Sequence, residues 1–374
     1  MKITGIETFA PRIALKPECC MVSALGASNG HQFTVVRMLT DSEYEGVGEA
    51  SATVRWSGET AATTCSLIHE VLGPAITGMD PTDIEAIDKK MDAVCADNWF
   101  AKSALEMACW DIRGKEAGVP VFELLGGAVR SLTIRSRFSL GAYDVPRAQS
   151  RVAELVEMGF DTIKVKVGGR AEDDIARVKA VREVIGFERA LVIDANCGWD
   201  TETAIHCMNE LVDCRIDLAE QPTPKRDYEA MARVRRETNV PILADDTCFD
   251  LVDAQELIRN DCCDAISVYP GKNGGIRKAA EIVDFAAQHG VACSIGSNLE
   301  WDVATAAMAH LIVSRENMQV EKYPGDLLGP FYHQQRIARN PLEIQGPLTT
   351  LHELPGLGID VAWDQLANSQ VPGS

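Results

Sequence analysis

The feature that most constrains the fold is a repeat of short β-branched apolar segments and longer amphipathic segments over the second half of the chain. Eight apolar segments follow Ser131, with centres roughly 24–30 residues apart. They are Leu132–Leu140, Thr162–Val167, Ala190–Ala195, Ile216–Glu220, Pro241–Ala244, Ala265–Tyr269, Ala292–Ile295 and Met318–Glu321. Helical patterns lie between them, at Ala171–Val184, Glu202–Val212, Ala254–Arg259, Ile276–His289 and Ala304–Ser314. Eight strand–helix units of this size predict an α/β fold of the (β/α)8, or TIM, barrel type.

An open doubly wound sheet is the alternative to a barrel. Such a sheet does not need eight units, and its first strand–helix turn is usually rich in glycine. The sequence contains neither GxGxxG nor GxxxxGK[ST], the two glycine-rich patterns that bind phosphates in such sheets. The barrel is therefore the favoured prediction.

The first 130 residues have a mixed pattern that predicts an α+β domain. Two strand-like segments, Lys2–Phe9 and Phe33–Thr40, precede helical stretches at 58–71, 81–96 and 98–117. Segments Pro17–Ala27 and Ala50–Gly58 are rich in small and polar residues and are predicted as loops. We predict an α+β domain at 1–130 and the barrel at 131–340. The irregular tail at 341–374 is expected to return to the first domain.

Composition narrows the class of protein. The chain has 36 Lys and Arg against 55 Asp and Glu, a net charge of −19, which argues against non-specific binding to nucleic acid. No uncharged apolar run is long enough to span a membrane, and the first residues lack the pattern of a signal peptide. The 12 cysteines form no CxxC pair, so we expect buried reduced thiols in a cytoplasmic protein.

Three acidic residues end three successive predicted strands. Asp194, Glu220 and Asp245 are 26 and 25 positions apart, one strand–helix unit each. They should therefore lie at matched heights at the carboxyl end of the barrel, where active sites of this fold are found. A single acid there is more simply a helix cap, but three converging carboxylates need a cation. Oxygen donors without nearby His or Cys favour Mg2+, with Mn2+ as the alternative.

Two lysines share one face of the second predicted strand. Lys164 and Lys166 are two residues apart, so both side chains point into the barrel, where an ammonium group is costly without a role. The alternative, a pair of solvated edge lysines, is weaker because apolar residues alternate with them. Next to a divalent cation their pKa should fall towards neutrality, as a general base requires.

These motifs together resemble the enolase superfamily, and within it the muconate lactonizing enzyme (muconate cycloisomerase) subgroup. The carrying residues are Lys164-Val165-Lys166, Asp194-Ala195-Asn196, Glu220 and Asp245, with Ala104–Ile112, Gly114-Lys115 and Pro120–Gly127 similar to the family's signature helix and linker. The resemblance spans essentially the whole chain. It implies an α+β capping domain over a modified TIM barrel, with Mg2+ held by the three acids. It further implies Lys166 as the base, with Lys164 polarising the substrate carboxylate.

The sixth predicted strand departs from the subgroup pattern. In members of the subgroup a catalytic lysine ends this strand, several residues before a Gly-Gly turn. Aligned on Lys272-Asn273-Gly274-Gly275, that position carries Tyr269, and Lys272 falls in the loop. The seventh strand end, at 294–298, also lacks the histidine of the mandelate racemase subgroup.

The expected chemistry is removal of a proton α to a carboxylate by Lys166. Tyr269 would stand on the opposite side of the barrel, and its phenol could protonate a departing hydroxide. This arrangement resembles the cis-3-hydroxy-L-proline dehydratases, so the leading hypothesis is dehydration of that amino acid to Δ1-pyrroline-2-carboxylate. A racemase or epimerase of a proline derivative or dipeptide is the second hypothesis, with Lys166 working against Tyr269 or Lys272. A non-catalytic metal-binding relative is the third.

Contacts to the amino-acid substrate are expected from both halves of the chain. A tryptophan could shield the substrate ammonium by cation–π contact, although plain packing is the commoner role, and an acid near the eighth strand could pair with it. The candidates are Asn196, Lys272, Trp56, Trp301 and Glu321, with Asp326 as the alternative acid. A small molecule is the only partner expected, apart from further copies of the chain, because family members commonly form homo-oligomers.

Overall fold

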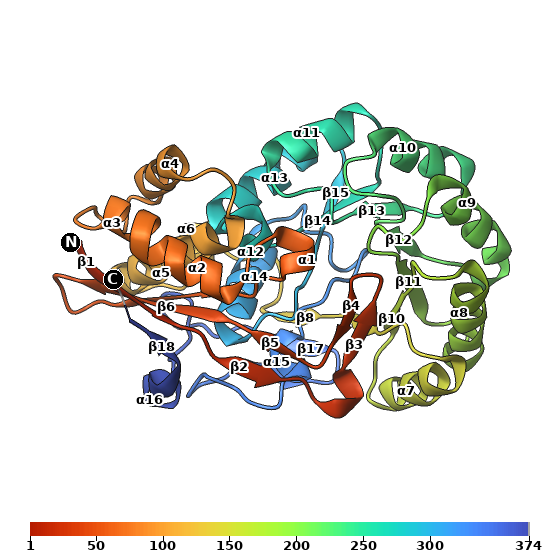
Figure 1. Cartoon of the computed structure of the whole chain (residues 1–374), viewed down its shortest axis with the longest axis horizontal. Helices are drawn as coiled ribbons and strands as arrows, with labels where there is room; N and C mark the ends of the chain where they lie inside the picture. Colours follow the sequence, from red (N-terminus) through yellow and green to blue (C-terminus); the bar gives the residue numbers. More distant parts are fainter. Residues whose placement is uncertain (373–374) are drawn as a thin grey trace.

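Parallel strands form a ring in the larger half of the molecule, and an α+β domain covers the ring's open end (Figure 1). The structure is a computed structural model that describes residues 1–372. Each paired strand neighbours the one before it in sequence, in the order β15-β14-β13-β12-β11-β10-β9. The bounds are β9 Phe138–Leu140, β10 Thr162–Lys166, β11 Ala190–Asp194, β12 Leu218–Glu220, β13 Ile242–Ala244, β14 Ala265–Val268 and β15 Ala292–Ile295.

Amphipathic helices surround the strands, as the sequence repeat predicts (Figure 1). Several begin with an aspartate side chain that accepts a hydrogen bond from the first turn, as Asp144, Asp200 and Asp250 do. The helices are α7 Val145–Glu157, α8 Ala171–Ile185, α9 Thr201–Glu210, α10 Tyr228–Glu237, α11 Leu251–Arg259, α12 Pro270–Asn273, α13 Ile276–Gln288 and α14 Asp302–Ser314, with the 3-10 turn η3 Val212–Cys214.

Two-residue alternation along the strands divides the inside of the ring from the outer core. On β11, Val192 belongs to a small apolar cluster inside the ring, while Ile193 joins the large core shared with the helices. Side chains two apart share a face, so Asp194 lies above Val192 on the inner side. The same spacing pairs Leu218 with Glu220 and Leu243 with Asp245. The ring therefore has an apolar floor and a charged top.

The eighth predicted strand, Met318–Glu321, is wrong. This segment makes only an isolated bridge, between Met318 and Cys293. Downstream, Lys322 and Tyr323 both donate backbone hydrogen bonds to the Gln319 carbonyl, so the chain turns back on itself. Pro324 follows and has no N–H to donate to a sheet. Segment 317–327 nevertheless fills the gap between β15 and β9.

The first predicted barrel strand, 132–140, is two strands. Only β9 belongs to the ring, and its residue Phe138 pairs with Ile163 of β10. The upstream part, β8 (Thr133–Arg135), pairs instead with a hairpin from the chain's last third, β16 (Glu343–Gln345) and β17 (Leu348–Thr350). The helix α15 (Gly329–Tyr332) precedes this hairpin.

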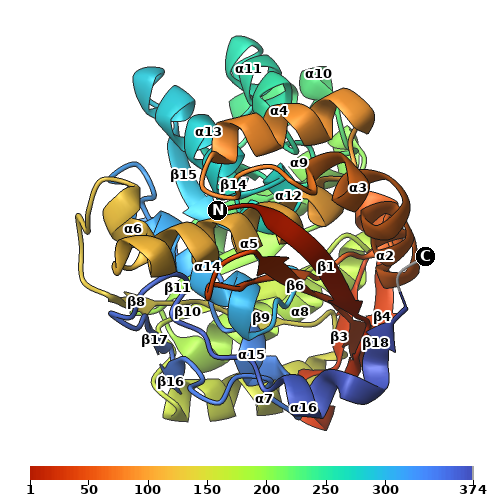
Figure 2. The same ribbon diagram turned by 90° about the vertical axis from the view of Figure 1, so that its left-hand side faces the viewer.

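The cap is built on an antiparallel sheet in the order β18-β1-β6-β7, and α5 lies behind it (Figure 2). The tail returns to this sheet, because β18 pairs with β1. The exact boundaries at 130 and 341 stay predictions. The elements are β1 Ile3–Phe9, β6 Thr34–Thr40, β7 Gly46–Ala50, β18 Gln370–Val371, α2 Ala61–Leu67, the π-helix η2 Ile68–Leu72, α3 Gly73–Ile76, α4 Ile84–Val94, α5 Trp99–Ala117, α6 Val121–Leu124, α16 Trp363–Leu366 and η4 Ala367–Ser369.

Strand β7, which the sequence analysis does not predict, packs directly on the backbone of α5. A Cβ atom on Gly48 would lie 1.7 Å from the Ala104 carbonyl oxygen, and one on Gly46 would lie 2.1 Å from that of Ala108. Ala104 and Ala108 are four residues apart on one face of the helix, and Gly46 and Gly48 are two apart on one face of the strand. The absence of a side chain at both glycines allows this close approach.

The two segments predicted as loops contain short elements over the open end of the ring. In the first lie η1 (Pro17–Cys19) and the hairpin of β3 (Met21–Ser23) and β4 (Gly26–Ser28); β2 (Arg12–Ala14) pairs with β5 (Gly30–Gln32) beside it. The second holds α1 (Val54–Ser57). Figure 1 shows β3, β4 and α1 of the cap lying next to the strands of the ring.

Two features bear on the class of protein. None of the helices in residues 1–372 combines the length and apolar character needed to cross a bilayer. All 12 cysteines are free thiols, and most are buried. Burial raises the pKa of Cys248 to about 12 and that of Cys262 to about 11, so these thiols behave as small apolar side chains.

Candidate active site

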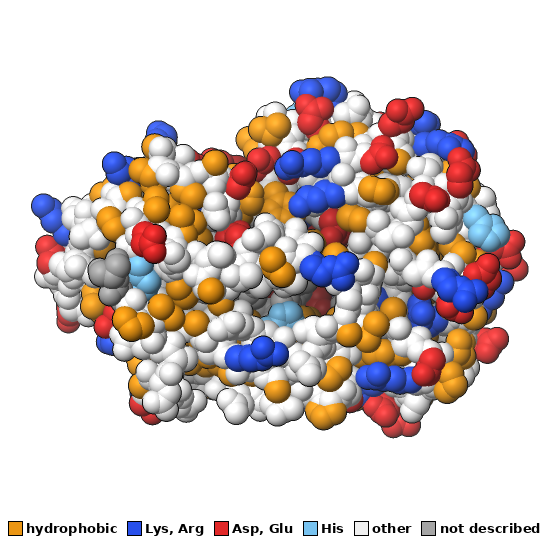
Figure 3. Space-filling view, in the orientation of Figure 1, with side chains coloured by type: hydrophobic (Ala, Val, Ile, Leu, Met, Phe, Trp, Pro, Cys, Tyr) orange, Lys and Arg blue, Asp and Glu red, His pale blue; other side chains and the backbone are white. Residues whose placement is uncertain are grey.

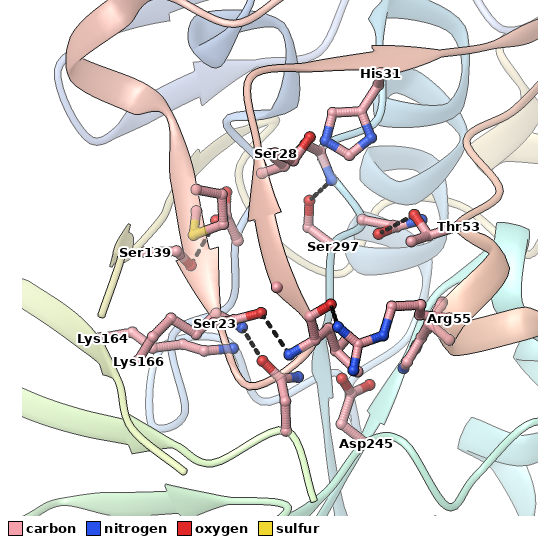
Figure 4. A pocket seen from close by; sticks show the side chains of 18 of the residues that line it. Ser23, Ser28, His31, Thr53, Arg55, Ser139, Lys164, Lys166, Asp245 and Ser297 are labelled. Atoms are coloured by element: carbon pink, nitrogen blue, oxygen red, sulfur yellow. Dashed lines mark hydrogen bonds between the residues drawn. The ribbon is translucent and has the colours of Figure 1, made fainter. Parts of the chain in front are cut away.

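A cavity of about 330 Å3 lies where the cap meets the charged top of the ring. Its cap side includes Ser23, His31 and Trp56, and its barrel side includes Lys166 and Tyr269. Figure 3 shows the opening as a hollow between the two halves, with acidic side chains visible inside it. Figure 4 shows the lysines and Asp245 at the bottom and His31 above them. The chemical groups therefore meet in a cavity that both domains shape.

Lys164 is held by two of the three predicted metal ligands. Its Nζ lies 2.7 Å from Asp194 Oδ2 and 2.6 Å from Glu220 Oε1. In the strand register Lys164 pairs with Val192, two residues before Asp194 on the same face, and Asp194 pairs with Glu220, so both carboxylates lie within reach of the Lys164 side chain. Two carboxylates thus converge on one cationic atom.

Lys166 lies beside it, closer to the open cavity. Its Nζ donates to Asp194 Oδ2 at 2.5 Å and to Asn196 Oδ1 at 2.8 Å. Burial alone would lower the pKa of Lys166, but the Asp194 and Glu220 carboxylates raise it above its ordinary value. The expected lowering concerns a site that holds a divalent cation, and for that state it stays a prediction.

The acids differ in their protonation although all are buried. Lys164 and Lys166 outweigh burial and hold the pKa of Asp194 below its usual range, and Lys272 does the same for Asp245. Burial and the neighbouring Asp194 raise the pKa of Glu220. Burial and the adjacent Asp245 raise that of Asp246 to about 7.

The donor set at the strand ends fits a hard divalent cation. Among residues 1–372, no group of three or more His, Cys, Asp or Glu side chains forms a ready-made metal cage, because lysine ammonium groups lie against these oxygens. The convergence of Asp194 and Glu220 on Lys164 Nζ marks a place where a cation is accommodated. Asp245 follows the next strand and lines the cavity with Glu220. It adds a third carboxylate, the kind of oxygen ligand that suits Mg2+.

Tyr269 faces the cavity from the other side of the ring. It directly follows β14, which three strands separate from β10 in the sheet order. The ring is fully buried, and its hydroxyl has no hydrogen-bond partner among the described residues. Burial and the Asp245 charge raise the pKa of Tyr269 well above its ordinary value, so the phenol keeps its proton.

A hydrogen-bonded chain links the two sides of the cavity. Trp56 Nε1 donates to Asp246 Oδ1 at 2.7 Å, and Asn196 Nδ2 reaches Asp246 Oδ2 at 3.5 Å. Asn196 in turn accepts from Lys166. Trp56 and Asn196 both line the cavity, and both are bonded to the acid next to Asp245; their contact with a substrate stays a prediction.

Sequence reasoning missed Arg137 and Ser139, which lie beside the cavity acids. Arg137 is completely buried, and its Nη2 donates to Glu220 Oε2 at 3.1 Å. Ser139 lies two residues on, on the same face, and donates to Asp326 Oδ2 at 3.0 Å. The sequence could have indicated them, because polar residues at i and i+2 of a barrel strand point to the same face. Asp326, the alternative acid of the sequence analysis, lines the cavity.

Three predicted substrate contacts do not line the cavity. Lys272 is fully buried and uses its ammonium on Asp245 Oδ1 (2.8 Å) and the carbonyls of Asp245 and Ser267. Trp301 stacks on Phe33, and its Nε1 donates to the Gln335 carbonyl. The Glu321 side chain is 67% exposed and pairs with Arg130, because the turn before Pro324 directs it outwards.

Two family models match the chain. The model described as mandelate racemase / muconate lactonizing enzyme, N-terminal domain, covers residues 3–126. The model described as enolase C-terminal domain-like covers residues 147–365. The chain belongs to this family, and so to the muconate lactonizing enzyme subgroup of the enolase superfamily of enzymes.

Similar proteins span nearly the whole chain. The hydrophobic dipeptide epimerase of Enterococcus faecalis is 35% identical over 96% of this chain and 99% of its own length. The N-succinyl-L-Arg/Lys racemase of Bacillus cereus is 31% identical over 98% and 97%. A crystal structure of the latter has a TM-score of 0.95 at 30% identity, covering 100% of this chain and 99% of the other.

The predicted dehydration of cis-3-hydroxy-L-proline is wrong in the light of these relatives. They include two L-Ala-D/L-Glu epimerases beside the dipeptide epimerase and the racemase, and also chloromuconate cycloisomerases; none of these is named as a dehydratase. The premise that Tyr269 donates a proton is compatible with either reaction. A buried phenol that donates a proton to a leaving hydroxide can equally donate it to a carbon atom, so Tyr269 did not by itself distinguish elimination from inversion.

Proposed function

We propose that this protein is a racemase or epimerase that inverts the α-carbon of an amino-acid residue in a dipeptide or an N-acylated amino acid. One observation carries the proposal: Lys166 and Tyr269 line one cavity from strands on opposite sides of the ring. Inversion requires a proton to leave one face of the α-carbon and return to the other. The names of the similar epimerases and racemases supply the substrate class.

Lys166 is the proposed base. In the first step the α-C–H bond breaks and an N–H bond forms at Lys166 Nζ, which has to enter the step as the neutral amine, and negative charge is left on the substrate carboxylate. A divalent cation held by the neighbouring acids would favour that neutral form. Lys164, held between Asp194 and Glu220, places a fixed positive charge beside that carboxylate. Asn196 accepts a hydrogen bond from Lys166 and so fixes the direction of its ammonium group.

Tyr269 is the proposed proton donor on the second face. Its O–H bond breaks as the new C–H bond forms, and solvent returns the proton from the Lys166 ammonium to the phenolate. The walls that bury the ring keep water from reprotonating the carbon at random. A tyrosine replaces a lysine here, so the two faces are handled by groups of different chemistry.

Asp194, Glu220 and Asp245 are the residues proposed to hold Mg2+. When bound, the metal supplies positive charge that balances these acids and stabilises the negative charge on the substrate oxygens. Solved structures of similar dipeptide epimerases, from Enterococcus faecalis and Cytophaga hutchinsonii, contain Mg with a dipeptide. Action in the cytoplasm and assembly into homo-oligomers complete the proposal.

The decisive experiment follows the α-proton. Purified protein with Mg2+ is incubated in D2O with a panel of dipeptides and N-succinyl amino acids. Mass spectrometry detects incorporation of one deuterium, and chiral chromatography detects inversion. We expect both for at least one member of the panel.

Matched lysine variants assign the activity to the site. Lys166→Ala should abolish inversion, whereas Lys179→Ala, on the exposed side of α8, should leave it unchanged. If the folded, Mg2+-loaded protein incorporates no deuterium into any panel member, the proposal fails and the non-catalytic hypothesis gains support.

A further inference from the structure

The Tyr269 ring lies in a slot between the cap and the barrel. On one face the indole of Trp56 is parallel to it, with an interplanar angle of 2° and ring centroids 5.7 Å apart. At the ring edge lies Gly296, the residue after β15. The backbone N–H of Tyr269 is also fixed, because it donates to Asn273 Oδ1 at 2.9 Å.

Gly296 is a glycine for reasons of space. A Cβ atom there would lie 2.5 Å from Tyr269 Cε1, 2.7 Å from Cδ1 and 2.3 Å from Ser267 Oγ. Its backbone does not adopt the left-handed conformation that favours glycine, unlike that of Gly274. The missing side chain is therefore what admits the phenol ring to this position.

Trp56 is itself held from two sides. Its indole N–H is bonded to Asp246 of the barrel. Its ring contacts Phe100 of the cap and Phe249 of the barrel, with centroids 5.9 and 5.2 Å away. The position of the Tyr269 ring therefore depends, through Trp56, on how the cap packs against the barrel.

We propose that Trp56 and Gly296 are positioning residues that aim the Tyr269 hydroxyl at one face of the substrate α-carbon. The inference rests on the proposed racemase or epimerase function. Lys166 is held directly by Asp194 and Asn196, and the atoms that a side chain on Gly296 would meet first belong to neither of them, but to Ser267 and Tyr269. Damage to the slot at Gly296 should therefore impair proton transfer on the Tyr269 face and spare proton removal by Lys166.

The test uses Gly296→Ala in the full-length, Mg2+-loaded protein. In D2O, the substrate epimer whose α-proton faces Lys166 should still exchange that proton, within about threefold of wild type. Inversion should fall roughly 100-fold, the size of effect that a misplacement of about 1 Å produces. Trp56→Leu removes the stacked ring and also the hydrogen bond to Asp246 that leads through Asn196 to Lys166, so it should lower both readouts, inversion more than exchange.

A double variant separates positioning from general damage. If Gly296 acts through Tyr269, then Gly296→Ala should cause no further loss of inversion in a Tyr269→Phe background. Gly5→Ala is the matched control, because its Cβ would meet only Leu39, at an ordinary 3.7 Å. It should change neither exchange nor inversion.

The outcomes distinguish this inference from the proposed function. Unchanged inversion in Gly296→Ala, or an equal loss of exchange and inversion, overturns the positioning role while wild-type turnover upholds the function. A further loss in the Tyr269→Phe background also overturns it. If the wild-type protein shows no exchange with any panel member, the function fails and takes the inference with it.

Discussion

Buried carboxylates occur in two regions of this protein, and their partners differ. Where the cap meets the barrel, Glu49 accepts hydrogen bonds from the backbone N–H groups of Trp301, Val303 and Ala304 at the start of α14. Glu106 likewise accepts from the start of α13. In the cavity, by contrast, Asp194 and Glu220 are bonded chiefly to lysine and arginine side chains.

The difference separates structural from chemical use of buried charge. Backbone N–H groups at a helix start are rigid and cannot move to a substrate, so Glu49 and Glu106 fasten the cap to the barrel. Ammonium groups on long side chains can exchange one oxygen partner for another. The cavity acids are therefore suited to a site whose contents change during turnover.

The largest predicted effect tests the cavity side of this comparison. Lys166→Ala should lower the rate of inversion by roughly 10³–10⁴-fold, because it removes the base for the α-proton. Chiral chromatography under single-turnover conditions measures the loss. Retention of more than a tenth of the wild-type rate would show that Lys166 is not the base.

The next effect tests the cap side. Glu49→Ala should lower the free energy of unfolding by roughly 3 kcal/mol, since it leaves three buried N–H groups without an acceptor. Urea titration measures this, with Glu85→Ala on the exposed face of α4 as a control that stays within about 0.5 kcal/mol. An equally small effect in Glu49→Ala would contradict a fastening role.

Metal removal should affect only the cavity acids. At Mg2+ about 100-fold above its Kd, the free energy of unfolding should exceed that in EDTA by about 2.7 kcal/mol. Asp194→Asn should lose this increment, whereas Glu49→Ala should keep it. Unfolding curves recorded with Mg2+ and with EDTA provide the measurement, and a full response in Asp194→Asn would remove that acid from the proposed ligand set.

The smallest predicted effect is a pH dependence of the cap. Burial raises the pKa of Glu59, which accepts from Phe100 and Ala101 N–H, from 4.5 to about 6. The folded state thus binds more protons between these values, and its stability should fall as pH rises through them, by at most about 2 kcal/mol. Glu59→Gln should flatten this part of the pH–stability curve; an identical slope in both proteins would contradict it.

Sequence reasoning succeeded where local spacing decides the outcome. Two-residue alternation placed Lys164 and Lys166 on one inner face, and one strand–helix unit separated each acid from the next. It failed where a side chain's direction depends on the path of an irregular segment. Glu321 points outwards because the chain turns before Pro324. Lys272 forms an ion pair with Asp245 instead of facing the cavity.

The reaction class shows a related limit. Tyr269 in place of lysine predicts a proton donor, but a donor does not specify the atom that receives its proton. Whole-chain similarity to epimerases and racemases supports a carbon atom as the acceptor in the proposed function.

The sequence by itself determined the repeat, the acids at successive strand ends and the paired lysines, because periods of two residues and of one strand–helix unit are written locally in the chain. Only the tertiary structure decided which cation faces which carboxylate, and that Trp56 and Gly296 enclose Tyr269. Those contacts join residues far apart in sequence, so they depend on how the cap and the barrel pack together. No local pattern encodes that packing.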